Sequence, residues 1–514
     1  MIVRQPSPES KQDSKDHPVI PSTWSESLHG LRASMVDAAE NGLPVHEVEQ
    51  EIWSQMLALG HKILESFFEQ SGTGDLGEHF ELPDGRTLRR LPGLYSRPYQ
   101  SIFGSFELAR AVYGKREGQK IELVPLDGRL QLPGGKFSYL LQDWSQYLAV
   151  ENPYSQVNRS LEKILGFKQS VDSLERMNRK MAVPVVDHLD SLPPPPAEEE
   201  AELMVSSADG KGVPLRKPTT TAPIHTHAPS SGPEPDKKKI ALLGVSYTVD
   251  RFYRTPEEVV ASLFRKSDAT NDNKKPRGRP QHKRLRASLE RGAAGTMQPA
   301  MDEVFGWLTR EAEERNSSGT KPHLVLMDGQ RSLWDAAEAT FSEDRIEILD
   351  LLHVTPRLWK AAYLFHPRKS AEATRFVRDR CLRVLQGKST SVVRGLRRMA
   401  TNSGLKGRKR SKLERICRYL ENNVHRMLYN EYLAAGYPIA TGVIEGACRH
   451  LVKDRLERSG MQWTMEGAQA MLDLRSVHLM EHWGAFQDFW VANENERLYP
   501  QKDLLDHVKW PFAA

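Results

Sequence analysis

Three acidic residues occupy positions from which carboxylates could do chemistry. Asp209 ends the run LMVSSAD, Asp328 ends PHLVLMD, and Glu445 lies in GVIEGACRHLVKDRL. Hard divalent cations such as Mg²⁺ prefer carboxylate oxygens. Two such ions, about 3.5–4 Å apart, stabilise the attacking and leaving oxygens of a phosphodiester in an in-line displacement. Two acids after strand-like runs and one on a late helix therefore favour metal-dependent phosphodiester chemistry.

The two aspartates also have structural interpretations. Asp209 precedes Gly210 between two strand-like runs, and Asp-Gly is a strong hairpin-turn signal. Asp328 follows a short apolar strand, at the end where α/β sheets place ligands, but it could instead cap the next helix. Ser332 is also available for that cap. Each aspartate is therefore either a turn or cap residue, or a metal ligand.

Glu445 fits a capping role poorly. A capping box needs a glutamate three residues after Ser or Thr, whereas Glu445 lies four residues after Thr441. Gly442 and Gly446 flank the acid, and each glycine inside a helix costs about 1 kcal/mol against alanine. Two such residues indicate a surface that another backbone or a phosphate approaches closely.

Two basic residues share the predicted helix with Glu445. Arg449 and Lys453 are four and eight residues further on, so an α-helix would align them on one face. They either form surface ion pairs with Glu445, worth about 0.2–0.5 kcal/mol each, or bind phosphates beside a metal. The spacing alone leaves both alternatives open.

Composition places the chain among ordinary globular proteins with a polar surface. It has 514 residues, 39% hydrophobic and 27% charged, with a net charge of +5. The three cysteines form no CxxC motif, which argues against a disulfide framework and fits a reducing cytoplasmic compartment. The sequence has neither a signal-peptide pattern nor an apolar run of about 18 residues, so no membrane partner is expected. Clustered basic residues indicate contact with a polyanion.

The N-terminal part is predicted to hold two DNA-binding modules. Residues 1–24 are expected to be disordered, residues 25–135 to form helices followed by β-hairpins, and residues 136–190 to be helical. Within the last range, Asn158–Ala182 has the outline of a helix-turn-helix, with a turn at Gly166. Either it is a plain helical hairpin, or four side chains face DNA: Gln169, Ser173, Arg176 and Lys180.

The rest of the chain is predicted to be an α/β domain with interruptions. A Pro-rich acidic linker covers residues 191–200. Alternating strands and helices follow over residues 201–366, with a basic loop at 266–291. A basic helical insertion covers 367–437, and helices of the same domain cover 438–490. Residues 491–514 form a C-terminal tail.

The combination of SSADGKGVP, VLMDGQR, ILDLLHV, LWKAAYLF and GVIEGACRHLVKDRLERSGMQW resembles the Kra-type insertion-sequence transposases. The resemblance covers about Leu91 to Trp463. These are DDE enzymes with an RNase H-like core, distantly similar to Mutator-like transposases. The resemblance implies an RNase H-like α/β core with a helical insertion, and a catalytic, metal-binding triad of Asp209, Asp328 and Glu445.

The resemblance also implies roles for other residues. The wider group has a Cys/Asp-x-x-His element between its second acid and its glutamate, which Asp350 and His353 match. Those two residues are alternatively a helix cap and a first-turn histidine. Relatives often have a Cys-rich knuckle before the Pro125–Asp127 motif, but this chain has no cysteine there, so zinc is not expected. Trp463 either stacks on an unpaired base or belongs to the core.

A short motif in the basic loop resembles an AT-hook. Pro276 to Pro280 reads PRGRP, in which Arg277 and Arg279 would enter a narrow A·T-rich minor groove. The alternative is a solvated basic loop.

The sequence thus predicts a DNA transposase. It would use two Mg²⁺ or Mn²⁺ ions to cleave double-stranded DNA at transposon ends and to join the freed end to target DNA. A homodimer or larger assembly on DNA and a location at the bacterial nucleoid are expected. Two other classes remain open: a transposase-derived DNA-binding protein without catalysis, and a nuclease without strand transfer.

Overall fold

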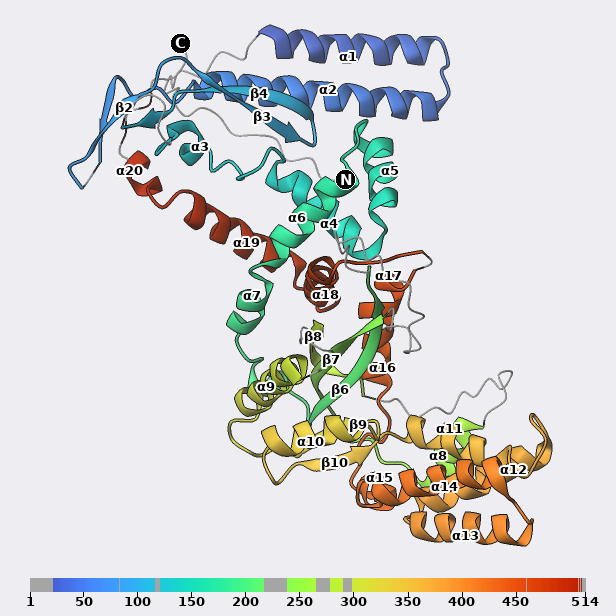
Figure 1. Cartoon of the computed structure of the whole chain (residues 1–514). Helices are drawn as coiled ribbons and strands as arrows, with labels where there is room; N and C mark the ends of the chain where they lie inside the picture. Colours follow the sequence, from blue (N-terminus) through green and yellow to red (C-terminus); the bar gives the residue numbers. More distant parts are fainter. Residues whose placement is uncertain are drawn as a thin grey trace, which may run out of the picture. The chain divides into compact units, whose positions relative to one another are not determined.

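The computed structural model describes residues 22–82, 84–115, 121–216, 238–264, 278–289, 298–458, 460–506, 508 and 510. The chain divides into two compact units (Figure 1). The N-terminal unit comprises Met1–Ser145, Asn158–Gln169 and Val491–Ala514, and the core unit comprises Gln146–Val157 and Ser170–Trp490. No described helix is long and apolar enough to cross a membrane.

The N-terminal unit begins with two long helices, α1 (Ser22–Glu40) and α2 (Val45–Ser71). The expected disordered segment therefore ends earlier than residue 24, because Ser22 already begins α1; residues 1–21 lie outside the described residues. Hairpins occur in the predicted range. Their strands are β1 (His79–Glu81), β2 (Thr87–Arg90), β3 (Tyr95–Ser101), β4 (Gly104–Arg110) and β5 (Tyr113–Gly114).

A buried ion cluster fastens this unit together. Asp127 lies in the short helix α3 (Pro125–Arg129). Its carboxylate accepts charge-assisted hydrogen bonds of 2.5 Å from Arg97 on strand β3 and from Arg110 on strand β4. A buried carboxylate needs such partners to offset its lost hydration. The motif at Pro125–Asp127, singled out in the sequence, is therefore a structural link between a helix and a hairpin.

The core unit is built on a five-stranded sheet. Its strands lie in the order β10-β9-β6-β7-β8. They are β6 (Leu203–Pro214), β7 (Lys238–Val249), β8 (Gln281–Leu289), β9 (His323–Met327) and β10 (Ile346–Leu349). Strands β6, β7 and β8 are successively antiparallel, whereas β9 and β10 run parallel to β6. The unit is thus mixed α/β, as predicted.

Helices cover both faces of this sheet. Ala208, Leu242 and Val325 pack in one hydrophobic cluster with residues of α9 (Gln298–Arg315) and α10 (Arg331–Thr340). A Cβ at Gly244 would lie 2.7 Å from Val304, so glycine lets α9 approach β7 closely. Successive strand residues point to opposite faces, so Asp209 points away from α9, towards the side of α16 (Gly442–Ala447) (Figure 1).

Part of the predicted basic loop is a strand. Residues 281–289 form β8 at the edge of the sheet, and Leu285 and Leu289 are buried. The basic side chains that suggested a loop are paired, since Arg284 contacts Glu311 at 2.9 Å and Arg286 contacts Asp190 at 2.6 Å. Apolar side chains at alternate positions decide the strand, while ion pairs neutralise its arginines.

The predicted linker is also partly integrated into the core unit. It contains a short 3-10 helix, Ala197–Glu199, followed by Glu200, which is buried. Glu200 accepts a hydrogen bond of 2.7 Å from Nε of Arg315, and this charge pair ties the segment to α9. Residues 191–200 lie within the core unit, so the predicted domain boundary at this Pro-rich linker is wrong.

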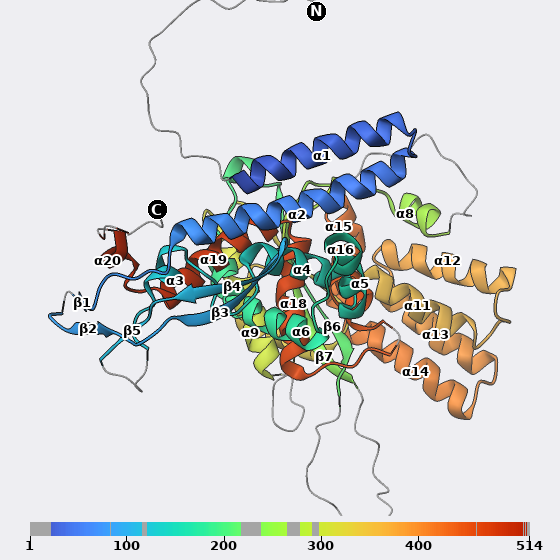
Figure 2. The ribbon, with the colours of Figure 1, turned by 90° about the horizontal axis from the view of Figure 1, so that it is seen from above.

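The range predicted as a helical insertion, 367–437, is helical. Its helices α12 (Ala371–Leu385), α13 (Ser389–Asn402) and α14 (Gly407–Asn422) lie beside α11 (Leu351–Ala362), which comes before that range and follows β10 (Figure 2). A 3-10 turn, Val424–Arg426, and α15 (Tyr429–Ala434) then lead back to the sheet. The separate helix α8 is Pro256–Leu263.

Two helices occur where the sequence left a helix-turn-helix and a plain helical hairpin as alternatives, and the division between the two units falls between Gln169 and Ser170. Helices α5 (Tyr154–Leu165) and α6 (Val171–Ala182) are separated by Gly166, with φ of 78°, and Ser170 caps α6. Gln169 cannot face DNA, because it is buried and accepts a hydrogen bond of 2.9 Å from Ser145. The other helices outside the site are α4 (Tyr139–Glu151), α7 (Val185–Ser191), α18 (Met465–Leu479), α19 (Trp483–Leu498) and α20 (Lys502–Asp506).

Candidate active site

Three aspartates are aligned across the sheet, because the strands that carry or precede them are neighbours and run parallel. The register pairs Ser206 of β6 with Val325 of β9, so Asp209 is level with Asp328, three residues along each strand. Asp350 follows β10, and its backbone N–H donates to the carbonyl of Met327, which precedes Asp328. The sheet register therefore brings Asp209, Asp328 and Asp350 to the same level.

Asp209 is not in a turn. Strand β6 continues through it to Pro214, with Asp209 opposite Leu243 of β7. The hairpin interpretation of Asp-Gly is therefore wrong, and pairing over the whole strand overrides the local turn signal. Its Oδ1 accepts a hydrogen bond of 2.8 Å from Gly210 N, and its Oδ2 accepts one of 3.3 Å from the buried thiol of Cys448.

Asp350 is both a cap and a member of the site. Its Oδ1 accepts a hydrogen bond of 2.8 Å from Leu352 N and caps helix α11. Its Oδ2 contacts Nδ1 of His353 at 3.2 Å and accepts a hydrogen bond from the hydroxyl of Thr441. The side chain of Asp350 is 0% exposed. The cap and the site, which the sequence offered as alternatives, are therefore compatible.

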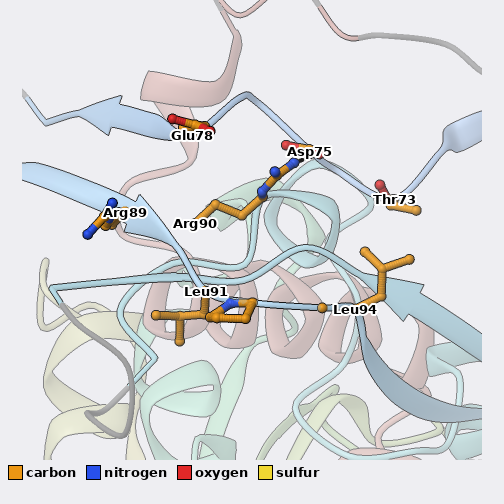
Figure 3. A pocket seen from close by; sticks show the side chains of 9 residues that line it. Thr73, Asp75, Glu78, Arg89, Arg90, Leu91 and Leu94 are labelled. Carbon is orange, nitrogen blue, oxygen red and sulfur yellow. Dashed lines mark hydrogen bonds and ion pairs between the residues drawn. The ribbon is translucent and has the colours of Figure 1, made fainter.

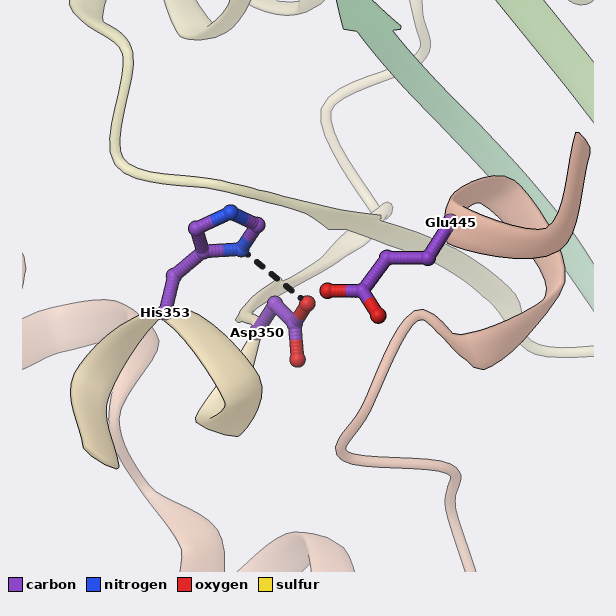
Figure 4. A group of neighbouring side chains, drawn as sticks. All are labelled: Asp350, His353 and Glu445. Atoms are coloured by element: carbon purple, nitrogen blue, oxygen red, sulfur yellow. Dashed lines mark hydrogen bonds and ion pairs between the residues drawn. The ribbon is translucent and has the colours of Figure 1, made fainter. Parts of the chain in front are cut away.

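Glu445 faces this pair from α16. Donor atoms of Asp350, His353 and Glu445 all lie within 4.8 Å of one another (Figure 4). Among the described residues, no other three acidic, histidine or cysteine side chains meet this closely. The resemblance implied that Glu445 groups with Asp209 and Asp328. In the structure, the closest group of ligand atoms instead joins Glu445 to Asp350 and His353, the two residues expected to be accessory. Carboxylates suit Mg²⁺ or Mn²⁺, and the imidazole adds affinity for transition metals.

Glu445 takes no part in a capping box, as its spacing from Thr441 predicted. Thr441 makes no side-chain cap for α16, because its hydroxyl bonds Asp350 instead. A Cβ added at Gly442 or at Gly446 would meet nothing within 4 Å. No described part of the protein requires these two glycines, so the space beside Glu445 is open to a ligand.

The acids perturb one another's ionisation. Burial raises the pKa of Asp209, and the neighbouring charge of Asp328 raises it further. Burial also raises the pKa of Glu445, with a second contribution from Asp350. The hydrogen bond to Asp350 raises the pKa of His353. Like charges gathered in a partly buried place disfavour ionisation, and a bound cation would relieve this repulsion.

A π-helix follows Glu445, and the sequence did not predict it. Residues Cys448–Lys453 form this turn, whose hydrogen bonds span five residues rather than four. The buried Arg475 of α18 donates to the carbonyls of His450 and Leu451 and holds the turn in place. The i+4 rule that aligned Arg449 and Lys453 with Glu445 does not apply within this turn.

The predicted DNA-contacting residues have separate surroundings. Arg449 and Lys453 are exposed, and Arg449 lies 3.7 Å from Asp454 rather than pairing with Glu445. On α6, Arg176 is exposed and pairs with Asp172 at 2.9 Å, and Lys180 is half-buried. Arg279 is exposed, whereas Arg277 lies outside the described residues.

Trp463 is a core residue. It is buried, its indole N–H donates to the carbonyl of Leu456 at 3.1 Å, and the guanidinium of Arg455 lies 4.9 Å from its ring. The base-stacking alternative is therefore wrong for this side chain.

A cavity in the N-terminal unit is a weaker candidate site. It has a volume of about 840 Å³ and is lined by Asp75, Glu78, Arg89 and Arg90, with Leu91–Leu94 on one side (Figure 3). Arg90 pairs with Asp75, so two of its four charges already neutralise each other. The lining carries charges of both signs, and the described residues around it include no close group of metal ligands.

Comparison with known proteins identifies no relative. No protein-family model matches the sequence, and no curated protein matches it. The function is therefore inferred from the chemistry of the acids and their positions on the sheet.

Proposed function

We propose that this protein is a metal-dependent DNA transposase that cleaves phosphodiesters and joins DNA strands. One observation carries the proposal: the register of three parallel strands aligns Asp209, Asp328 and Asp350, and Glu445, from a helix more than 90 residues later, lies against Asp350 and His353. Carboxyls whose pKa is raised by burial and by a neighbouring acid, as those of Asp209 and Glu445 are, are typical of functional sites. Hard cations bound by such acids stabilise the charges of phosphodiester cleavage.

The strand order supports the RNase H-like part of the proposal. Three antiparallel strands followed by two strands parallel to the first is the arrangement expected of that core. The helical insertion between Asp350 and Glu445 agrees with the resemblance to Kra-type transposases.

Each residue would have a distinct task. Asp209 and Asp328 would share metal ions along the sheet edge, and Asp350, His353 and Glu445 would complete a neighbouring position. Bound Mg²⁺ or Mn²⁺ would activate the attacking water or hydroxyl and stabilise the leaving oxygen. Cys448 and Gly210 orient Asp209 through its two oxygens. The open surface at Gly442 and Gly446 gives the DNA backbone access to Glu445.

The experiment compares strand cleavage and joining by three proteins. The substrate is DNA from the flanks of this protein's own coding sequence, incubated with Mg²⁺ or Mn²⁺. Wild type is compared with Glu445→Ala and with Glu466→Ala, a matched control on an exposed glutamate of α18. Wild type and Glu466→Ala should cut and join, and Glu445→Ala should do neither.

The outcomes separate the alternatives. DNA binding without cleavage by wild type would favour a transposase-derived binding protein. Cleavage without joining would favour a nuclease. Cleavage that persists in Glu445→Ala would remove Glu445 from the site.

A further inference from the structure

Helix α2 of the N-terminal unit carries a stripe of exposed apolar side chains. Val45, Ile52, Met56, Ile63 and Phe67 are each between 38% and 74% exposed. Their spacings are 7, 4, 7 and 4 residues, which places them along one side of the helix. Soluble proteins rarely leave such a continuous apolar surface uncovered. We call these five residues the α2 stripe.

The other sides of α2 are already used. Leu64 and Phe68, each one residue after a stripe residue, pack against the cluster of Phe106, Leu108 and Leu132. A Cβ at Gly60 would overlap the ring of Phe103. Glutamates lie two residues after three stripe residues, about 200° around the helix; these are Glu47, Glu65 and Glu69. The α2 stripe is therefore an apolar side of the helix that the described part of the chain leaves exposed to solvent, and it lies opposite an acidic side.

The charge of the helical hairpin excludes the usual polyanionic partners. Residues 22–71 contain eight Asp and Glu but only two Lys and Arg. Phosphates of DNA and of anionic membranes would be repelled by this surface. The first 21 residues carry only five aliphatic side chains: Met1, Ile2, Val3, Val19 and Ile20. They are a poor match for a stripe that is six turns long.

We propose that the α2 stripe is a dimerisation surface, on which α2 packs against α2 of a second copy of this chain. Spacings of seven and four make an 11-residue repeat, close to three turns of an α-helix, which keeps the stripe on one side of the helix along its length and lets two helices pair side by side. The exposed stripe, with Trp53 beside it at 48% exposed, offers roughly 500 Å² per copy. Two copies would then bury about 1,000 Å², the size that specific interfaces reach.

The two helices pair antiparallel around Met56. Glu49 is the one acid within the stripe. A parallel pair would place the two copies of Glu49 side by side, whereas an antiparallel pair centred on Met56 separates them by about 20 Å. That arrangement sets Val45 of one copy opposite Phe67 of the other and gives the two-fold symmetry common in homodimers. The proposal does not depend on whether the acids cleave DNA.

Sedimentation of the full chain without DNA tests the dimer. Wild type should sediment as a dimer at micromolar concentration, and Met56→Glu should be monomeric with unchanged helix content. Ser54→Glu adds the same charge on the opposite side of α2, at an exposed position, and should remain dimeric. A monomeric wild type, or a dimeric Met56→Glu, would overturn the proposal. If deletion of residues 1–21 converts a monomeric wild type into a dimer, that segment is the occupant instead.

Disulfide cross-linking tests the direction of pairing. The three native cysteines are buried, so they give little background. Met56→Cys should oxidise to a covalent dimer, because the axis passes close to it. Val45→Cys alone should not, but it should cross-link when mixed with Phe67→Cys. Efficient self-cross-linking of Val45→Cys would overturn the antiparallel arrangement.

Discussion

The acids on the strands and the acid on the late helix are held in opposite ways. Asp209 and Asp350 are fixed by a sheet whose neighbouring strands set their level, and each uses both oxygens in hydrogen bonds. Glu445 is exposed on a helix of six residues, followed by a π-helix and flanked by open space. The strands thus supply a fixed platform, and the helix supplies a ligand that substrate can reach.

The largest expected effect concerns the platform. Asp209→Asn should lower metal-dependent DNA cleavage roughly 10³-fold, because losing several kcal/mol of charge stabilisation costs about three factors of ten. The same substitution should raise the melting temperature of the metal-free protein, since it removes a buried charge that Asp328 repels. Glu445→Gln should lower cleavage with a smaller gain in melting temperature, because that carboxyl is less buried. An equal stabilisation in both variants would contradict the contrast in burial.

The second effect is on folding stability. Asp350→Ala should lower the free energy of unfolding by about 3 kcal/mol, because a helix cap is lost and the buried Thr441 hydroxyl is left without a partner. Glu445→Ala should change it by less than about 0.5 kcal/mol, as exposed positions do. Denaturant unfolding measures both. Similar losses in the two variants would show that Glu445 is as firmly embedded as Asp350.

A smaller effect is the dependence of stability on pH. Raised pKa values of Asp209 and Glu445 mean that their stabilising contribution is complete below the unfolded pKa, near 4, and is lost as pH rises through the folded values. The raised pKa of His353 gives a further loss above about pH 6.5. Added Mn²⁺ should therefore raise the melting temperature more at pH 8 than at pH 5.5. A hundredfold excess over Kd corresponds to a gain of about 2.7 kcal/mol in the free energy of unfolding. Equal shifts at the two pH values would refute this linkage.

The smallest effect concerns the exposed side of the late helix. Lys453→Ala should reduce the slope of log affinity for DNA against log salt by about 0.9, the value for one phosphate contact. Asp454→Asn should make the salt slope steeper and strengthen DNA binding, because it removes the carboxylate that pairs with Arg449. Fluorescence anisotropy at several salt concentrations measures both changes. An unchanged slope in Lys453→Ala would remove that residue from the DNA contact.

The sequence predicted the platform better than the helix. Asp328 and Asp350 each follow a short apolar strand, and parallel strands bring their ends together whatever the details of packing. The turn signal at Asp209-Gly210 failed because pairing with β7 on one side outweighs local preference. The prediction of a basic loop was wrong at β8 for a similar reason. The acids that pair with Arg284 and Arg286 are distant in sequence, so the local pattern does not show that these charges are neutralised.

Other features left no sequence signal. A π-turn differs from an α-helix by one residue in its backbone hydrogen bonds, and no side-chain pattern marks it at Cys448–Lys453. The stabilising Arg475 comes from a helix that is more than 20 residues away. The contact of Cys448 with Asp209 depends on that same turn. Thr441 looked like a cap because its bond to Asp350 spans 91 positions.

That bond has a consequence for the order of events during folding. Asp350 and Glu445 are separated by the whole insertion, and the chain is closed at its base by Thr441 on Asp350 and by Leu351 N on the carbonyl of Ile439. Closing this loop costs entropy before its contacts give any gain, whereas the strands that carry or precede Asp209, Asp328 and Asp350 all come before the insertion and can pair without it. The strand acids can therefore assemble while the insertion is still unfolded. Glu445 arrives last, so a chain that stalls at this stage has a complete sheet and no complete metal site.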